Sequence, residues 1–283
     1  MSKLSWHVFA MAGLVTAFSG SLYAVDGVIL IDQPHALAGN ITPGDAPGFP
    51  VTLSQPGSYR LSGNLSVPDA ATTAIQITAD GVTLDMNGFS IIGPVTCTAL
   101  STGMGANCPA ASTGVGILAA QPNGAGGPLG VKVYNGTVKG MGLHGIELLG
   151  FGSVVEKVTA YSNAGDGMLV AGSIIGSAVM QNGKVGLLAT VVRETFAFQN
   201  AGDGIVLDGI GGTAFAVISS FNGGNGVLSQ NGIVTNSTIV RNVLVGISAR
   251  CPSSLVNNNI VNNQGGTIVT ESPGCVSVNN GLL

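Results

Sequence analysis

Charged and aromatic residues are scarce in this chain. Charged residues make up 8% of its 283 residues, against roughly 25% in an average soluble protein. Aromatic residues make up 5%, and the formal net charge is −4. A nucleic acid is not an expected partner, because the chain does not supply a basic surface. Few side chains are left for acid–base or metal chemistry.

Long apolar runs are missing as well. The uncharged, largely apolar run at 8–18 has 11 residues, fewer than the roughly 18 that a membrane helix needs. It follows Lys3 and precedes small residues up to Ala24, which is the pattern of a secretory signal. We predict a signal peptide at 1–24, no membrane span, and a secreted, periplasmic or cell-surface location.

Glycine is abundant, with 45 residues, and in the second half it recurs at a constant distance from asparagine. Six Asn residues are each followed four positions later by a Gly, and the Asn positions lie 19, 18, 22, 20 and 20 residues apart. A constant turn with arcs of variable length indicates a coiled repeat. The pairs are Asn163/Gly167, Asn182/Gly186, Asn200/Gly204, Asn222/Gly226, Asn242/Gly246 and Asn262/Gly266.

Short alternating segments flank these turns. After each Gly comes an apolar, variable, apolar triplet, which predicts a strand whose outer members point inward. A second strand precedes each Asn, and we expect the residue two positions before the Asn to point inward too. Coils of about 20 residues leave no room for a crossover helix. The residues expected to point inward before the Asn are Tyr161, Met180, Phe198, Ser220, Val240 and Ile260.

These patterns predict an all-β fold, a single-stranded parallel β-helix of about nine coils stacked at roughly 4.8 Å. We expect the Asn column to form a hydrogen-bonded ladder, since an amide has both donor and acceptor, and each repeat Gly to let the backbone leave the turn. We assign the proline-rich segment 25–70 to an N-terminal cap and 71–283 to the β-helix, with insertion loops at 95–112 and 119–130.

The chain contains four cysteines. An even number in an exported chain predicts structural disulfides. We expect Cys97 to pair with Cys108, closing a small loop, and Cys251 to pair with Cys275, about one coil away. The other connectivities and free thiols stay open as alternatives.

Several segments before the repeat carry a family resemblance: GFP at 48–50, GSYRL at 57–61 and VTLDMNGF at 82–89. With them the chain resembles exported bacterial right-handed parallel β-helix proteins and, more distantly, the pectin-lyase-like superfamily. The resemblance implies right-handed winding. It also implies an alternative function as a polysaccharide lyase, epimerase or hydrolase.

The catalytic apparatus that this resemblance implies is not matched. Lyases of the superfamily use calcium held by acidic side chains, whereas the outward column after the Gly reads Glu, Leu, Leu, Val, Leu, Ser from Glu147 to Ser248. One carboxylate cannot supply the six to eight oxygen ligands of calcium. Hydrolases need two carboxylates within about 5–10 Å, and no Asp-Asp pair occurs. We expect no cofactor, with calcium conceivable only under the lyase alternative.

The best remaining constellation is His144, Glu147 and Asp166. His144 and Asp166 each precede a Gly in neighbouring coils, so they could form a hydrogen-bonded general base. The same column continues as Val185, Asp203, Asn225 and Val245, where Asp-Gly and Asn-Gly are ordinary turn pairs. A structural role for the column is therefore the competing interpretation.

The outward apolar column Leu169, Leu188, Val206 and Leu228 predicts an exposed stripe. A protein partner, a second copy of the chain or the 119–130 loop could cover it. Without a tryptophan in the mature chain, and with Tyr161 expected inside, a long glycan groove is not indicated. The sequence favours an exported scaffold that presents a surface to a partner or an extracellular glycan, without an identifiable catalytic site. A polysaccharide-active enzyme is the alternative.

Overall fold

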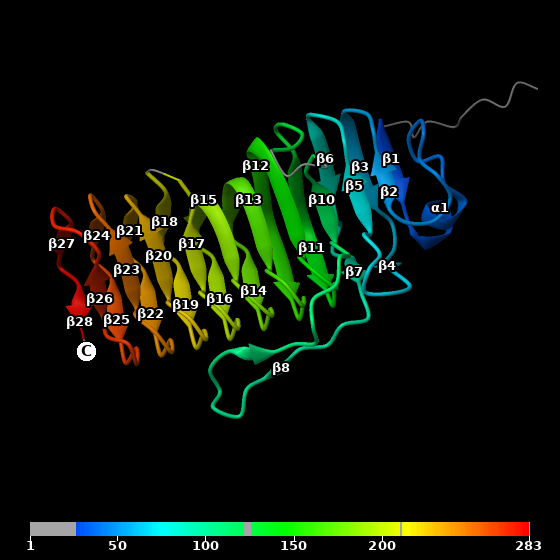
Figure 1. Cartoon of the computed structure of the whole chain (residues 1–283). Helices are drawn as coiled ribbons and strands as arrows, with labels where there is room; N and C mark the ends of the chain where they lie inside the picture. Colours follow the sequence, from blue (N-terminus) through cyan, green and yellow to red (C-terminus); the bar gives the residue numbers. More distant parts are fainter. Residues whose placement is uncertain (1–26, 122–125, 210, 283) are drawn as a thin grey trace, which may run out of the picture.

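The computed structural model describes residues 27–121, 126–209 and 211–282, which form a rod of stacked coils (Figure 1). The predicted signal peptide lies outside the described residues. The rod has about 10 turns, and its long sheet is parallel throughout. Both the parallel β-helix and the all-β class are thus confirmed. No helix in the described part of the chain has the length and apolarity to cross a bilayer.

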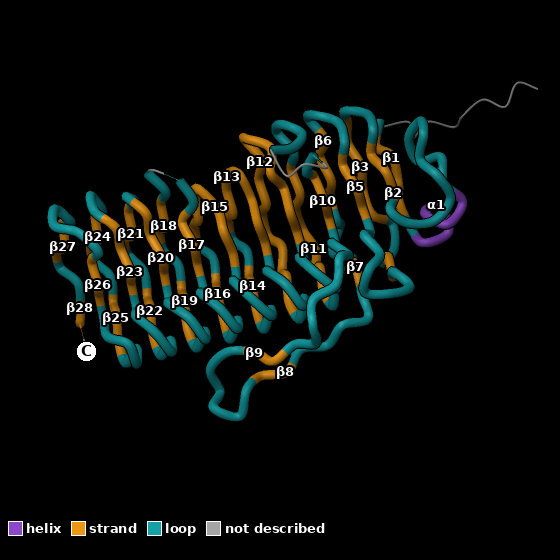
Figure 2. The backbone as a smooth tube through the Cα atoms, in the orientation of Figure 1, coloured by secondary structure: helices purple, strands orange, loops and turns teal. Residues whose placement is uncertain are grey.

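Each coil contributes strands to three faces of the rod (Figure 2). The first face follows the repeat Gly, the second follows the next corner, and the third leads into the Asn. Strands β12, β13 and β15 are long and bend from one face to the next. The first face consists of β2 (Val51–Leu53), β5 (Ile75–Ile77), β10 (Ile117–Ala119), the starts of β12 (Ile146–Tyr161), β13 (Met168–Ile175) and β15 (Leu187–Arg193), β17 (Ile205–Leu207), β20 (Val227–Gln230), β23 (Ile247–Arg250) and β26 (Ile268–Thr270).

The second and third faces are built in the same way, and a small antiparallel pair, β8 (Thr98–Ala99) with β9 (Ala106–Asn107), lies outside the coils. The second face consists of β1 (Val28–Ile31), β3 (Gly57–Leu61), β6 (Val82–Asp85), the start of β11 (Lys132–Lys139), the middle of β12, the ends of β13 and β15, β18 (Thr213–Phe215), β21 (Ile233–Thr235), β24 (Ser254–Val256) and β27 (Val276–Val278). The third face consists of β4 (Leu65–Ser66), β7 (Ser90–Ile92), the ends of β11 and β12, β14 (Ala178–Met180), β16 (Phe196–Phe198), β19 (Ile218–Ser220), β22 (Thr238–Val240), β25 (Asn259–Val261) and β28 (Gly281–Leu282).

The segment 25–70 combines a short helix with the first coil. Helix α1 (Gln33–Ala38) begins at Asp32, whose carboxylate accepts the His35 backbone N–H, and it buries Ala36 at the end of the core. Strand β1 pairs with β3 inside this segment, and β2, β3 and β4 pair with strands of the following coil. The helix therefore covers an end of the stack that would otherwise be open.

The core is a set of aliphatic columns running along the rod. On the first face the outer members of each triplet are buried, as in Ile146 with Leu148 and Ile205 with Leu207, so the alternation predicted there is confirmed. Parallel strands in register place like residues in contact from coil to coil.

The inward assignment of the third face was wrong by one position at Tyr161, Met180, Phe198 and Val240, whereas Ser220 and Ile260 are buried as predicted. Tyr161, Met180 and Phe198 are partly exposed, while the residues one step earlier, such as Ala160 and Val179, are fully buried. The cause is the residue between this column and the Asn, which adopts a left-handed backbone and interrupts the period-two alternation. The residues with this conformation are Ser162, Gln181, Gln199, Phe221, Arg241 and Asn262, with φ between 50° and 57°.

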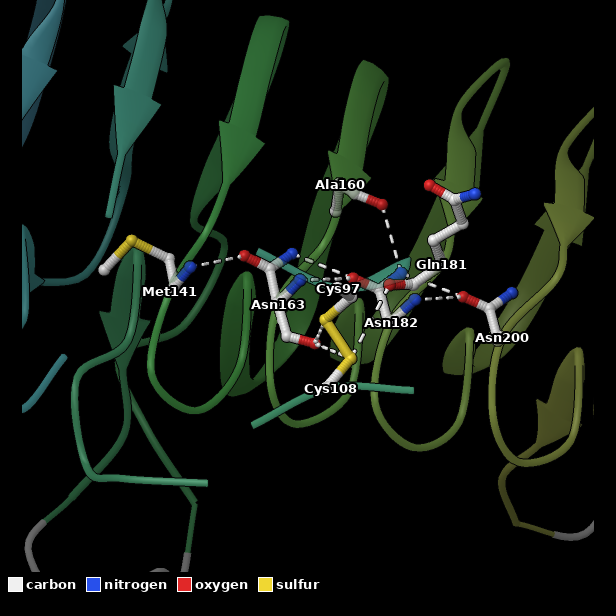
Figure 3. Close-up of a disulfide and its surroundings, with 8 residues drawn as sticks. All are labelled: Cys97, Cys108, Met141, Ala160, Asn163, Gln181, Asn182 and Asn200. Carbon is white, nitrogen blue, oxygen red and sulfur yellow. Dashed lines mark hydrogen bonds between the residues drawn. A yellow bond between two sulfur atoms is a disulfide. The ribbon is translucent and has the colours of Figure 1, made fainter. Parts of the chain in front are cut away.

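The predicted asparagine ladder is present and completely buried along most of its length (Figure 3). In each step a side-chain Nδ2 donates to the Oδ1 of the next Asn at 2.9–3.0 Å, and that same Oδ1 accepts the preceding Asn's backbone N–H. The last member is Asn263 and not Asn262, because Asn262 occupies the left-handed corner position. The ladder therefore runs through Asn163, Asn182, Asn200, Asn222, Asn242 and Asn263.

The first five repeat glycines serve close packing and not conformational freedom, whereas Gly266, with φ +109° and open space beside it, has the predicted conformational role. At Gly167 a Cβ atom would lie 2.5 Å from the Gly186 carbonyl oxygen and 2.7 Å from the Asn182 Nδ2. Neither neighbour can move, because the carbonyl belongs to the backbone and the amide to the ladder. Any side chain at this position would separate the coils at the ladder.

A second polar column, which the sequence analysis missed, lines the corner between the second and third faces. The Ser237 backbone N–H donates to Asn258 Oδ1 at 3.1 Å, and Asn258 Nδ2 donates to Asn280 Oδ1 at 3.0 Å. Earlier in the rod, Ser177 and Thr195 occupy the same place. Because Ser, Thr and Asn alternate in this column, no single residue type repeats, and the sequence pattern does not reveal it.

Both predicted disulfides are present. The Cα atoms are 4.3 Å apart in Cys97–Cys108 and 4.9 Å apart in Cys251–Cys275. The first closes the insertion loop, and the second joins successive coils near the carboxyl end.

Replacing Asn200 by alanine should destabilise the protein strongly. The side chain is fully buried and bonds to Asn182, Asn222 and the Val179 carbonyl. Its loss leaves buried amide groups without partners, at about 1–3 kcal/mol for each. We expect the free energy of unfolding in urea to fall by about 3 kcal/mol or more. The matched control is Asn259→Ala, since Asn259 is exposed, and its expected change is within about 0.5 kcal/mol. Equal losses of stability in both variants would contradict a stabilising role of the buried ladder.

Candidate functional site

The first face carries the predicted apolar stripe of Leu169, Leu188, Val206 and Leu228. The four side chains stand in register and are partly exposed. The described part of the 119–130 loop is held elsewhere, since the Leu129 N–H donates to Asp80 Oδ1 at 2.7 Å. Use of the stripe by a protein partner or a second copy stays a prediction.

His144 and Asp166 lie together, as their equivalent places in neighbouring coils predict. His144 Nδ1 is 3.2 Å from Asp166 Oδ2, and the two side chains are 13% and 15% exposed. The same Nδ1 is 3.1 Å from the backbone nitrogen of Asp166. One ring nitrogen can either accept the backbone N–H or donate to the carboxylate. The neutral ring with its proton on Nε2 makes the first bond, and a ring with a proton on Nδ1 makes the second.

The backbone bond belongs to a series that repeats along the rod. Asp166 Oδ1 accepts the Val185 N–H at 2.8 Å, Asp203 Oδ1 accepts the Asn225 N–H at 2.6 Å, and Asn225 Oδ1 accepts the Val245 N–H at 3.2 Å. Each polar side chain of the column thus holds the backbone of the next coil. This repetition supports the structural interpretation of His144 and Asp166.

The wider catalytic constellation is not assembled. Glu147 points outward from the first face, and among the described residues it has no hydrogen bond or ion pair with His144 or Asp166. Lys157 does not join the pair, because it lies at the corner between the second and third faces and pairs with Glu156 at 3.3 Å. Within the described ranges, no group of three or more His, Cys, Asp and Glu side chains is placed to hold a metal ion.

The third face carries an aromatic row, which we define as Tyr161, Phe196, Phe198 and Phe221. Tyr161, Met180 and Phe198 follow one another in register on successive coils. The Phe198 ring centre is 5.5 Å from that of Phe196 and 5.5 Å from that of Phe221. Tyr161 and Phe198 point outward, so this face offers aromatic rings to a ligand, contrary to the expectation that Tyr161 lies inside.

A cation stands at each end of the aromatic row. Lys139 Nζ is 5.7 Å from the centre of the Tyr161 ring, and the Arg241 guanidinium is 5.6 Å from that of Phe221. At these distances the positive charge is attracted by the ring face. The row is therefore a partly exposed apolar surface with positive ends.

The insertion loop 95–112, which we call the strap, lies along the corner beside this row (Figures 1 and 2). Its disulfide sulfurs contact the carbonyl oxygens of Asn163 and Gln181 (Figure 3). Farther along, Gln199 Nε2 donates to the Gly103 carbonyl at 2.8 Å, and the Gly105 N–H donates to the Phe221 carbonyl at 2.7 Å. The strap thus crosses several coils and borders the row on one side.

A pocket of about 270 Å³ opens where the strap leaves the third face. On the strap side it is lined by Val95 and Thr96, and on the coil side by Lys139, Tyr161 and Ser162. It joins the row at its first ring, so pocket and row form one continuous surface. The pocket could not be predicted from the sequence, because no repeat or spacing indicates that the strap lies next to Tyr161.

The family model described as "Right handed beta helix region" matches residues 116–282. The chain belongs to the right-handed β-helix family. The match covers more than half of the chain, and it agrees with the resemblance stated from the sequence. No curated protein matches the sequence.

Several solved structures share the fold of this β-helix protein at low sequence identity. The Dettilon tailspike protein is 12% identical, with a TM-score of 0.55 over 81% of this chain and 56% of its own. A mutant of the periplasmic alginate epimerase AlgG is 15% identical, with a TM-score of 0.55 over 82% and 70%. The enzymatically active domain of bacteriophage CBA120 tailspike protein 2 is also 15% identical, with a TM-score of 0.54 over 81% and 41%. At such identities the likeness shows the fold alone.

The structural role of His144 predicts different effects for two substitutions. Asn225 makes the same kind of bond with an amide oxygen, so His144→Asn should retain the acceptor for the Asp166 N–H. We expect His144→Ala to lower the free energy of unfolding by about 1 kcal/mol and His144→Asn by less than half of that, measured in urea. An equal loss in both variants would show that this hydrogen bond does not stabilise the coil.

Proposed function

We propose that this is an exported glycan-binding β-helix, whose ligand lies along the third face between the aromatic row and the strap. The observation that carries the proposal is the row itself. In a protein with few aromatic residues, four partly exposed rings gather on one face: Tyr161 and Phe198 share a column with Met180 between them, and Phe196 and Phe221 contact Phe198. The C–H faces of sugar rings are apolar and pack on flat aromatic surfaces, and their hydroxyl groups stay in water.

The shape of the site fits an extended ligand. The coils repeat at roughly 4.8 Å, so the row runs parallel to the rod axis, and the strap forms a wall on one side. Two disulfides are typical of an oxidising compartment, where extracellular glycans are found. The structural neighbours include an alginate epimerase, which supports a polysaccharide as ligand, although a shared fold is a weak warrant by itself.

A second candidate function is polysaccharide modification at His144 and Asp166. The pair is only 3.2 Å apart and mostly buried, and a carboxylate-oriented imidazole can act as a general base. Neighbouring structures include an epimerase and a domain called enzymatically active. The lack of an assembled partner for the pair makes binding without catalysis the better-supported function.

Truncating the central ring should weaken glycan binding. Phe198 contacts both neighbouring rings of the row, and buried aromatic anchors commonly contribute about 2 kcal/mol or more. We expect Phe198→Ala to raise the Kd by about tenfold or more, measured by affinity electrophoresis and calorimetry on polysaccharides that the wild-type protein retains. Phe215→Ala, on the second face, is the matched control because its ring is also exposed and should leave the Kd unchanged. Equal weakening by both variants would place the ligand elsewhere.

The enzymatic candidate requires a separate assay. The purified protein is incubated with acidic and neutral polysaccharides, with and without calcium, and unsaturated products and new reducing ends are followed. If His144 is the base, His144→Asn should lose at least a hundredfold in rate while remaining folded. Folded protein without activity on the panel, or activity unaffected by His144→Asn, would reject this role.

A further inference from the structure

The pocket at the root of the strap differs chemically from the rest of the protein surface. The strands of the third face, the left-handed residue before each ladder Asn and the strap contain two charged side chains, Lys139 and Arg241, and both are positive; Lys157 and Glu194 lie at the other corner of this face, next to the second face. The whole chain, in contrast, has 13 acidic against 9 basic residues. A cationic surface in an acidic protein attracts anions locally while the remainder repels them. This distribution of charge points to an anionic ligand.

Lys139 is also the lysine at this face that lacks an acidic neighbour. Among the described residues no carboxylate lies within 4.0 Å of its ammonium group, whereas Lys132 and Lys157 each approach Glu156, at 3.7 and 3.3 Å. The Lys139 ammonium instead lies near the Tyr161 ring. Its hydrogen-bond donors are therefore available to a ligand in the pocket.

The remaining lining suits a sugar unit. Its lining includes two hydroxyl-bearing residues, Thr96 and Ser162, one aromatic residue, Tyr161, and one apolar residue, Val95. The volume of about 270 Å³ lies just below the roughly 300 Å³ at which sites for drug-sized ligands begin. A pocket of this size has room for one sugar unit. Additional units must leave the pocket over Met180 and Phe198, which continue in register from Tyr161.

We propose that this pocket is a subsite for one anionic sugar unit, with Lys139 as the residue that binds its carboxylate or sulfate ester. The inference rests on the proposed function, because the pocket opens onto the aromatic row. It specifies which sugar unit the pocket selects and how the glycan chain is oriented. The charged unit binds where the strap leaves the third face, and the neighbouring units stack along that face. The strap supplies one wall, so the subsite exists only while the strap is in place.

Carboxylate and sulfate are distinguished by the choice of probe. Binding is measured by calorimetry with a polyuronate, a sulfated galactan and a neutral galactan of similar length, at low and at moderate salt. Wild-type protein should bind at least one acidic polymer about tenfold more tightly than the neutral polymer, and added salt should reduce this preference. Whichever acidic polymer is preferred identifies the anionic group.

The residue is tested with Lys139→Gln, which keeps a hydrogen-bonding side chain, one atom shorter, but removes the charge. We expect it to abolish the roughly tenfold preference for the acidic polymer and to leave the Kd for the neutral polymer unchanged. Lys157→Gln removes the same charge from another corner, where the side chain is 72% exposed, and should retain the preference. Both variants should melt at the wild-type temperature with both disulfides intact.

The outcomes separate the subsite from the glycan-binding function. If Lys139→Gln retains the acidic preference while Phe198→Ala weakens binding, the subsite is overturned and the aromatic row remains. If Lys157→Gln removes the preference as completely as Lys139→Gln, net charge and not the pocket is responsible. If folded wild-type protein binds none of the three polymers, both the subsite and the proposed function are overturned.

Discussion

The close stacking of coils at the asparagine corner is the constraint on which the rest of the structure depends. Each buried amide bonds to the amide of the next coil, and these bonds require the coils to approach to strand spacing. Glycine is needed beside the ladder because a Cβ atom there would collide with a backbone carbonyl and a ladder nitrogen. A buried amide without its partner is expensive, so every coil must keep the same register.

That register determines which side chains can form a surface. Since successive coils are aligned residue by residue, every outward position becomes a column along the rod. A repeated sequence therefore places similar side chains in one column, whereas a cluster of chemically different side chains requires departures from the repeat. The first face accordingly presents an aliphatic stripe with a single carboxylate, and the His144 column repeats one structural hydrogen bond. Catalytic groups of mixed type would have to come from loops outside the regular coils.

The strap is such a loop, and it makes the third face different from the other two. It leaves the stack after β7, crosses the corner of several later coils and is closed by Cys97–Cys108. Its contacts are with backbone carbonyl oxygens of the coils and with the side chains of Gln199 and Gln264. Together with the aromatic row it forms a surface with one wall, an apolar floor and a cation at either end. This asymmetry distinguishes the third face from the otherwise uniform rod.

The sequence by itself determined the repeat, the parallel β-helix, the ladder up to Asn242, both disulfides and the burial of the first face, because each depends on local spacing or on cysteine count. It could not determine the direction of Tyr161 and Phe198, since one left-handed residue before each Asn reverses the alternation and leaves no compositional mark: Ser, Gln, Phe and Arg all occupy that place. The same one-residue offset moved the last ladder member from Asn262 to Asn263. Only the tertiary structure decided that the strap lies beside the aromatic row and forms a pocket with Lys139, because contacts between Gly103 and Gln199, or between Gly105 and Phe221, join residues that no sequence pattern relates.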